Sequence, residues 1–305
     1  PTVLHDAGTL SHFAAQDIIE TARAPGTTTG WLAQLLMENG LSAKDHAMSF
    51  GTRPPLSMAG TPFPAPNFVH LSDIDLATAW KDRQVLGQVM ESAYAGPING
   101  NNPNAAMLHQ IGAYLPSEIE ALKGIGEASL SSRSMYPETL FGTQMRHAAA
   151  LIRARSNLNL LTVDFSGWDT HRMQGSHDGH LSALLAQFSA AVSGFFDDLG
   201  SLASNVLVLA ATEFGRTAAE NASAGTDHGH ASTWLVMGPS VRGGIYLGDR
   251  GWPGLAEDNL ADGRALAHTT DFRSIYSEIA GKFLGTANLA GLFPGFLDSE
   301  LGFLA

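Results

Sequence analysis

The most constraining feature of this sequence is an alternation of helical patterns and short apolar runs after about residue 140. Helical patterns over 144–155 and 181–199 alternate with apolar runs at 158–165, 205–211 and 233–238. Uninterrupted apolar runs of this length indicate strands buried on both faces, and long helices between strands favour a parallel sheet. The expected fold class is therefore α/β, with a mostly parallel central sheet covered by helices on both faces.

The rest of the chain is expected to belong to the same domain. A length of 305 residues suits one large α/β domain, so we assign residues 1–305 to a single unit. Prolines at four separate sites oppose regular structure over 52–67, and a run rich in Gly, Asn and Pro opens the segment 96–140. Both segments are expected to be irregular, loop-rich insertions.

The composition excludes several classes of function. The net charge is −12, from 17 basic and 29 acidic residues, so no nucleic-acid partner is expected. Cysteine is absent, which excludes disulfides, thiolate metal sites and cysteine nucleophiles. Any metal ligand must therefore be His, Asp, Glu or another oxygen donor. No apolar run approaches the roughly 18 residues of a membrane helix, so no membrane span is expected.

Histidines and carboxylates gather close to the ends of the apolar runs. Asp169 and His171 follow the first run, and Glu213 follows the second. His228 and His230 alternate in a polar stretch before the third run. Ligands of α/β proteins bind beyond the carboxyl ends of the strands, and alternate residues of an extended chain point to the same side. The sequence therefore predicts a divalent metal site with Asp169, His171, Glu213, His228 and His230 as ligands.

Each of these residues also has a plainer interpretation. Asp169 is equally typical of a turn beside a surface histidine. Glu213 is placed for a local ion pair with Arg216, and His228 could belong to a solvated polar loop. If the loop does bind metal, Asp227 is placed to orient an imidazole ring.

A second group of candidates begins the helical pattern near the N-terminus of the sequence. Ser11 and His12 precede apolar residues at helical spacing, and the N-terminus of a helix favours anions. Ser11 could therefore be a nucleophile toward a phosphate or sulfate ester, or simply a helix-capping residue. We assign His12 and Arg216 to the binding of the substrate anion, with Arg216 also a catalytic candidate because its planar fork matches an oxyanion.

The same residues lie in motifs that resemble the domain-of-unknown-function 1501 (DUF1501) family, a relative of the alkaline phosphatase and sulfatase superfamily. The motifs occur in family order and extend over nearly the whole chain. They are S-H-F-A-A-Q-D (11–17), G-W-D-T-H-R-M-Q (167–174), T-E-F-G-R-T (212–217), G-T-D-H-G (225–229), V-R-G-G-I-Y (241–246) and T-D-F-R (270–273).

The resemblance implies an alkaline-phosphatase-like three-layer α/β/α sandwich and export to the bacterial periplasm or beyond the cell. It implies a hydroxyl nucleophile near Ser11 and metal-binding segments at Asp169, His171, Glu213 and His228. The ion is expected to be zinc, with manganese or calcium as alternatives. Phe214 stands where superfamily enzymes often carry a further ligand, which disfavours two metal ions.

These expectations lead to two hypotheses about function. The first is an exported, metal-dependent hydrolase of phosphate or sulfate esters, acting on a small anionic substrate. The second is a non-catalytic exported protein of the same fold, serving as a carbohydrate-binding or assembly partner. Family members usually begin with a strand and an R-G-G-x-D-G-like segment, which is not found in this sequence. This segment is expected to have been removed, to exist as another polypeptide, or to be missing from an incomplete site. The candidate partners are a separate N-terminal polypeptide or a homo-oligomer.

Overall fold

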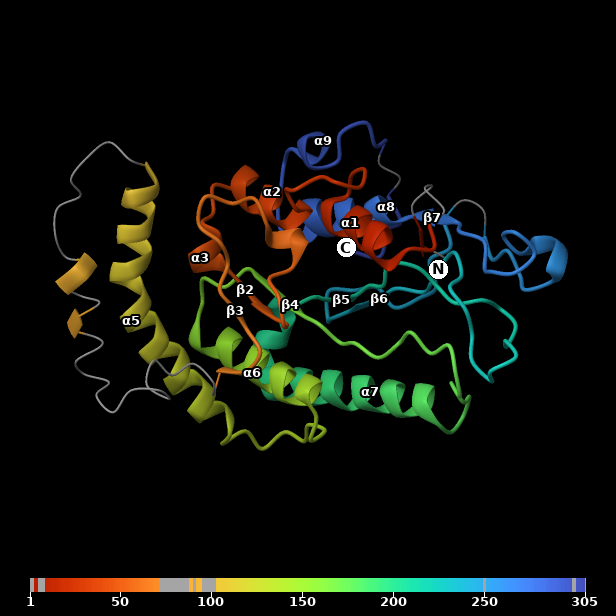
Figure 1. Ribbon diagram of the computed structural model, residues 1–305, viewed down its shortest axis with the longest axis horizontal. Coiled ribbons are helices and arrows are strands. Elements are labelled where there is room, and N and C mark those ends of the chain that lie inside the picture. The colour runs from red at the N-terminus through yellow and green to blue at the C-terminus, as the bar shows by residue number, and fades with distance from the viewer. Residues whose placement is uncertain are drawn as a thin grey trace.

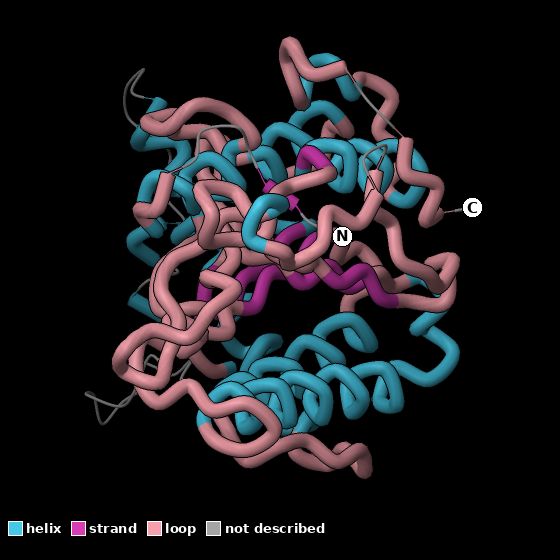
Figure 2. Tube along the Cα trace, turned by 90° about the vertical axis from the view of Figure 1, so that its right-hand side faces the viewer, coloured by secondary structure: helices cyan, strands magenta, loops and turns pink. Residues whose placement is uncertain are grey.

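The computed structural model describes most of the chain, namely residues 3–4, 9–71, 88–89, 92–94, 103–248, 251–297 and 300–304. Strands lie in the middle of the molecule, with helices on both sides of them (Figures 1 and 2). Helices α1, α2 and α8 cover one side, and α6 and α7 cover the other (Figure 1). The α/β class predicted from the alternation is confirmed at this level.

Three strands form a small parallel sheet in the order β3-β2-β4. They are β2 (Ala47–Phe50), β3 (Asn67–Phe68) and β4 (Leu160–Val163). A second parallel pair joins β1 (Val3–Leu4) to β7 (Thr270–Asp271). The parallel sheet that the sequence predicted around residues 158–165 is present. Its central strand, β2, was not predicted from an apolar run.

The last two predicted strands pair differently from the expectation. β5 (Val208–Ala210) and β6 (Leu235–Met237) form an antiparallel pair. The connection between them contains loops and turns rather than a crossover helix. A chain that returns without a crossover helix can place its second strand antiparallel to the first. The sheet was expected to be mostly parallel, and this pair of strands departs from that expectation.

The helices follow the predicted pattern closely in the second half of the chain. The expected helices at 144–155 and 181–199 correspond to α6 (Leu140–Ala154) and α7 (His180–Leu199). The other α-helices whose bounds lie within the described residues are α1 (His12–Thr21), α2 (Trp31–Glu38), α3 (Ala43–His46), α5 (Pro103–Ser129), α8 (Phe272–Glu278) and α9 (Leu289–Leu292). Shorter helical turns are η1 (Leu56–Met58), η3 (Gly200–Asn205), η4 (Glu257–Asn259) and the π-helical η5 (Ile279–Phe283). None of the described helices combines the length and apolar character that a membrane crossing requires.

Two hydrophobic clusters lie against the strands and explain their apolar sequences. Along and just before β5, Leu207 and Leu209 pack into the cluster built on α1, α2 and α8. Their neighbours Val206 and Val208 pack into the cluster of α6 and α7. Successive side chains of a strand point to opposite faces, so an uninterrupted apolar run suits a strand with helices on both sides.

The segment 96–140 is more ordered than expected. Residues 96–102 lie outside the described residues, but Pro103–Ser129 forms the 27-residue helix α5, with Pro116 inside it. This helix runs along one edge of the molecule (Figure 1). Glu118 is buried and pairs with Arg155 just after α6, and Leu122 is fully buried. Packing against α6 therefore overrides the local preference of proline and glycine for irregular structure. Segment 52–67, by contrast, contains only η1 and the first residue of β3.

Candidate metal centre

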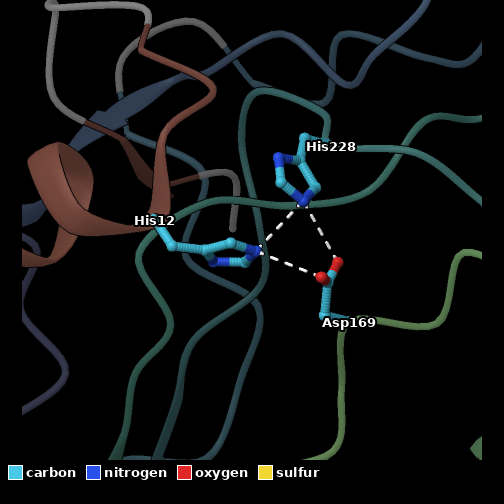
Figure 3. Close-up of side chains that lie close together, drawn as sticks. All are labelled: His12, Asp169 and His228. Carbon is cyan, nitrogen blue, oxygen red and sulfur yellow. Dashed lines mark hydrogen bonds and ion pairs between the residues drawn. The ribbon is translucent and has the colours of Figure 1, made fainter.

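Two histidines and one aspartate from distant parts of the chain converge at one point (Figure 3). His12 is the first residue of α1, Asp169 follows β4, and His228 lies in the loop before β6. The His12 Nε2 atom lies 3.0 Å from His228 Nε2 and 3.4 Å from Asp169 Oδ2. His228 Nε2 lies 3.1 Å from Asp169 Oδ1. Three potential ligand atoms thus face a common point.

The other ring nitrogen of each of these histidines is held by an acceptor. His12 Nδ1 contacts the Glu213 carboxylate, and His228 Nδ1 lies 2.7 Å from the backbone oxygen of Leu10. A carbonyl or an ionised carboxylate can only accept a hydrogen bond, so each Nδ1 carries the proton and donates it. In the neutral ring, Nε2 then has a free lone pair that points into the cluster.

A third histidine has the same arrangement. His171 Nε2 lies 3.0 Å from Asp169 Oδ1, and His171 Nδ1 lies 2.9 Å from Asp227 Oδ1. Asn221 donates a second hydrogen bond to the same Asp227 oxygen at 3.0 Å. The hydrogen bonds from His171 and Asn221 lower the pKa of Asp227. An ionised Asp227 then keeps the His171 proton on Nδ1 and turns Nε2 toward Asp169.

This donor set fits a divalent cation. Two Nε2 lone pairs at 3.0 Å repel each other, so a cation, either a proton or a metal ion, is needed between them. Two imidazole nitrogens and one carboxylate converge, and the His171 nitrogen lies beside the same carboxylate. Such nitrogen and oxygen donors are typical of zinc, whereas calcium prefers oxygen ligands throughout. The carboxylate and carbonyl acceptors behind the rings are the outer layer that metal-binding histidines usually have.

Arg216 reaches the cluster from the segment after β5. Its Nη1 contacts Asp169 Oδ1, while Nε donates to Thr226 Oγ1 at 3.1 Å and Nη2 to the Thr226 backbone oxygen. Desolvation raises the pKa of Asp169, but the hydrogen bond and charge of Arg216, with the charges of His171 and His228, together lower it. The alternative in which Arg216 pairs with Glu213 does not match this geometry.

Two glycines allow the two loops of the site to approach each other. Gly229 N donates to Gly215 O at 2.8 Å, and Arg216 and His228 form an antiparallel bridge. A Cβ atom at Gly215 would lie 1.9 Å from the backbone oxygen of Ala231, and one at Gly229 would lie 2.4 Å from the Arg216 backbone. No side chain fits at such distances, so the glycines of T-E-F-G and D-H-G hold His228 and Arg216 side by side.

The predicted metal ligands therefore divide into three groups. Asp169 and His228 belong to the group whose ligand atoms converge, whereas His171 contacts Asp169 from outside that group. Glu213 lies behind the cluster on His12 Nδ1, so its carboxylate contacts a ligand instead of the ligand site. His230 Nε2 lies 2.9 Å from His268 Nδ1, a residue to which the sequence analysis gave no role. His230 is not among the three residues whose ligand atoms converge.

The residues predicted to bind the substrate or to act in catalysis also differ from expectation in their positions. His12, predicted to bind the substrate anion, belongs to the converging group. Ser11 is at the N-cap of α1, but its exposed side chain makes no capping hydrogen bond. Phe214 is buried, with ring centroids 4.7 Å from His12 and 4.9 Å from His228. The aromatic ring thus forms one wall of the cluster, in agreement with a single ion.

Three features of the site have no local signature in the sequence. The Leu10 carbonyl acts through its backbone, Thr226 acts partly through its backbone oxygen, and Asn221 is one polar residue among many in its loop. Only two motifs indicate this region in the sequence: T-D-H-G, which begins with Thr226, and T-E-F-G, which directly precedes Arg216.

Comparison with known proteins gives one match. The model of a family described as "Protein of unknown function (DUF1501)" matches residues 81–289, which is more than half of the chain. This span contains Asp169, His171 and His228, whereas His12 precedes it. No curated protein and no solved structure matches the chain.

Proposed function

The chain belongs to the DUF1501 family, whose function is unknown, and from its site we propose that it is an exported, metal-dependent hydrolase of phosphate or sulfate esters. The observation that carries this proposal is the orientation of the three imidazole rings. His12, His171 and His228 each place Nδ1 on an acceptor and turn Nε2 toward Asp169. Such an arrangement serves cation binding, since it presents three lone pairs beside one carboxylate.

The proposed ligands are His12, Asp169 and His228, with His171 as the fourth. Three nitrogen donors favour zinc, with manganese as the next candidate and calcium the least suited. When bound, the ion supplies Lewis-acid chemistry, polarising the ester oxygens and lowering the pKa of a coordinated hydroxyl.

The neighbouring residues support an anionic ester as the substrate. The Arg216 guanidinium lies against Asp169, where it can bind an oxyanion through its remaining N–H groups. Ser11 is the N-cap residue of α1 and precedes His12 in the chain, and its hydroxyl makes no capping hydrogen bond. We infer that the Ser11 oxygen attacks phosphorus or sulfur while the bond to the ester oxygen breaks, and that the hydroxyl proton passes to the released alcohol. Water would then release phosphate or sulfate from Ser11.

The fold supports the same proposal. Helices on both sides of the strands, and the parallel β3-β2-β4 sheet, are compatible with an alkaline-phosphatase-like three-layer α/β/α sandwich. The site lies beyond the carboxyl end of β4, where ligands of parallel sheets bind. A periplasmic or secreted location is part of the proposal and rests on the family resemblance.

An activity panel tests the proposal. Purified protein is loaded with zinc, manganese or calcium and assayed with phosphomonoester, phosphodiester and sulfate-ester substrates. We expect turnover with zinc or manganese, loss of turnover in His228→Ala together with metal loss, and loss of turnover in Ser11→Ala with metal retained. Metal binding without turnover on any substrate would contradict the hydrolase and favour the non-catalytic alternative. A protein that binds no metal would contradict both the metal site and the metal-dependent hydrolase.

A further inference from the structure

One oxygen of Asp169 is shared between the metal ligands and a fixed positive charge. Asp169 Oδ1 lies 3.0 Å from His171 Nε2 and 3.1 Å from His228 Nε2, and it also contacts Arg216 Nη1. An ion bound by these histidines and Asp169 would therefore lie close to the guanidinium. Two cations at such short distance repel each other, and the site is only partly shielded by solvent.

The guanidinium is fixed in this position by a chain of oriented hydrogen bonds. Nε and Nη2 of Arg216 both donate to Thr226, which is buried. The Thr226 hydroxyl donates in turn to Gln174 Oε1 at 2.6 Å, which leaves its lone pairs for Arg216. Because Thr226 holds the Nε and Nη2 atoms, the Arg216 side chain is hindered from moving away from Asp169 to reduce the repulsion between the guanidinium and the ion.

The same geometry leaves hydrogen-bonding capacity for an anion. A guanidinium has five N–H groups, and within the described part of the chain Arg216 uses three of them. The side chain is also 22% exposed. A tetrahedral oxyanion beside the ion can therefore accept hydrogen bonds from Arg216 while its negative charge lies between the two cations.

We propose that Arg216 couples metal binding to oxyanion binding, so that each strengthens the other. This inference rests on the proposed function and specifies how its site recognises the substrate. Without an oxyanion, Arg216 weakens metal affinity through repulsion. With an oxyanion, the guanidinium and the ion share one ligand. Thermodynamic linkage requires the two effects to be equal in size, and such couplings are commonly about 5- to 150-fold.

Calorimetric titration of the full chain with zinc, with and without inorganic sulfate, tests the coupling. We expect sulfate to tighten zinc binding about tenfold in the wild-type protein, within the usual range of couplings. Arg216→Gln should bind zinc more tightly than the wild type without sulfate and show less than about a twofold effect of sulfate. Arg216→Lys keeps the charge but loses the fork, so zinc affinity without sulfate should stay near wild type while the sulfate effect shrinks.

Arg264→Gln provides the matched control. The Arg264 side chain is largely exposed, and its Nη2 atom lies 4.0 Å from Asp227 Oδ2. Because Arg264 is paired with Asp227 and not with Asp169, its replacement should leave the coupling intact. Melting temperatures of all variants show whether they fold. The inference is wrong if zinc binds but sulfate does not change its affinity, or if Arg216→Gln retains the full sulfate effect. Absence of zinc binding in the wild type would instead overturn the proposed function itself, so the two failures are distinguishable.

Discussion

In the proposed metal site, Glu213 would support a ligand without touching the ion. Its carboxylate contacts His12 Nδ1, and Asp227 does the same for His171. Both carboxylates keep the proton on the outer nitrogen of a ring, so that the inner nitrogen is ready to bind. Their function is to position two of the ligands.

Glu213→Ala should lower zinc affinity about 10- to 100-fold, as expected when an acceptor behind a histidine ligand is lost. His12 would then be free to rotate and to change tautomer. Calorimetry measures the affinity, and ¹⁵N chemical shifts of the ring nitrogens report the tautomer of His12. Glu220→Ala, an exposed residue of the following loop, is the control. An unchanged affinity in Glu213→Ala would refute the positioning role.

Replacing Arg216 should change the titration of Asp169. Desolvation raises the pKa of Asp169, and Arg216 is the main influence that lowers it. In Arg216→Gln the pKa should rise, which carboxyl ¹³C shifts followed against pH can measure. A pKa that stays as low as in the wild type would mean that the histidine charges alone cause the shift.

The pairing of Asp169 with Arg216 also predicts how the free energy of unfolding changes with pH. Because the folded pKa of Asp169 is lowered, its stabilising contribution is present above the unfolded value of about 3.9. It is lost as pH falls through the folded value. Asp169 is 46% exposed, so the contribution is at most about 1 kcal/mol. The stability difference between wild type and Arg216→Gln should thus be present at pH 6 and shrink below pH 4 in urea denaturation.

The sequence predicted those parts of the site that depend on local spacing. Asp169 and His171 follow the apolar run of β4, and His228 precedes that of β6, so their positions next to strands could be recognised from the sequence. Glu213 was assigned as a ligand because position at a strand end does not tell which way a carboxylate points. His12 precedes Asp169 by more than 150 residues, and only the tertiary packing of α1 brings it to the cluster.

At the scale of elements, the site depends on how closely two loops can approach. The segments around Gly215 and Gly229 are joined by a hydrogen bond of 2.8 Å, and neither position has room for a Cβ atom. These loops carry Arg216 and His228. The T-E-F-G and D-H-G motifs are therefore explained by backbone packing as much as by the chemistry of their side chains.

Gly215→Ala should destabilise the protein by roughly 1–3 kcal/mol, because a methyl group is forced against the Ala231 carbonyl. It should also weaken zinc binding, since His228 moves with its loop. Denaturant unfolding and calorimetry measure the two effects. Gly243→Ala is the control, as no atom lies within 4 Å of a Cβ at that position. Equal behaviour of the two variants would show that the close approach of the loops is unimportant.

Elements were predictable where hydrophobic periodicity is strong. The patterns at 144–155 and 181–199 gave α6 and α7 because their apolar faces pack on each other and on the strands. Helix α5 was missed because Pro116 and several glycines oppose helix formation locally, whereas its contacts with α6 outweigh them. The antiparallel pairing of β5 and β6 depends on the path of the connecting loop, which periodicity does not encode.

At the scale of the whole molecule, the proposed metal centre joins segments that are far apart in sequence. His12 belongs to α1 on one side of the strands, Asp169 follows the parallel sheet, and His228 lies in the loop before β6. A ligand that binds all three in the folded state alone stabilises the entire fold by mass action.

Zinc should therefore raise the melting temperature of the whole chain. At a free zinc concentration about 100 times Kd the gain is about 2.7 kcal/mol, which corresponds to several degrees for a protein of this size, roughly 5 °C. Chelation should reverse the shift, and His228→Ala should show little of it. Differential scanning calorimetry measures these values. A similar shift in His228→Ala would place the stabilising ion elsewhere.

We propose that His12, His171, His228 and Asp169 together hold one divalent ion. X-ray absorption at the zinc edge, on protein loaded with one equivalent of zinc and desalted, tests it most directly. We predict a shell of imidazole nitrogens at roughly 2.0–2.1 Å together with carboxylate oxygen. In the double variant His12→Ala, His228→Ala, which keeps only His171 among the proposed imidazole ligands, the scattering of the imidazole rings should fall sharply or the zinc should no longer be retained. Zinc that is lost on desalting, or a shell of oxygens alone, would contradict the claim.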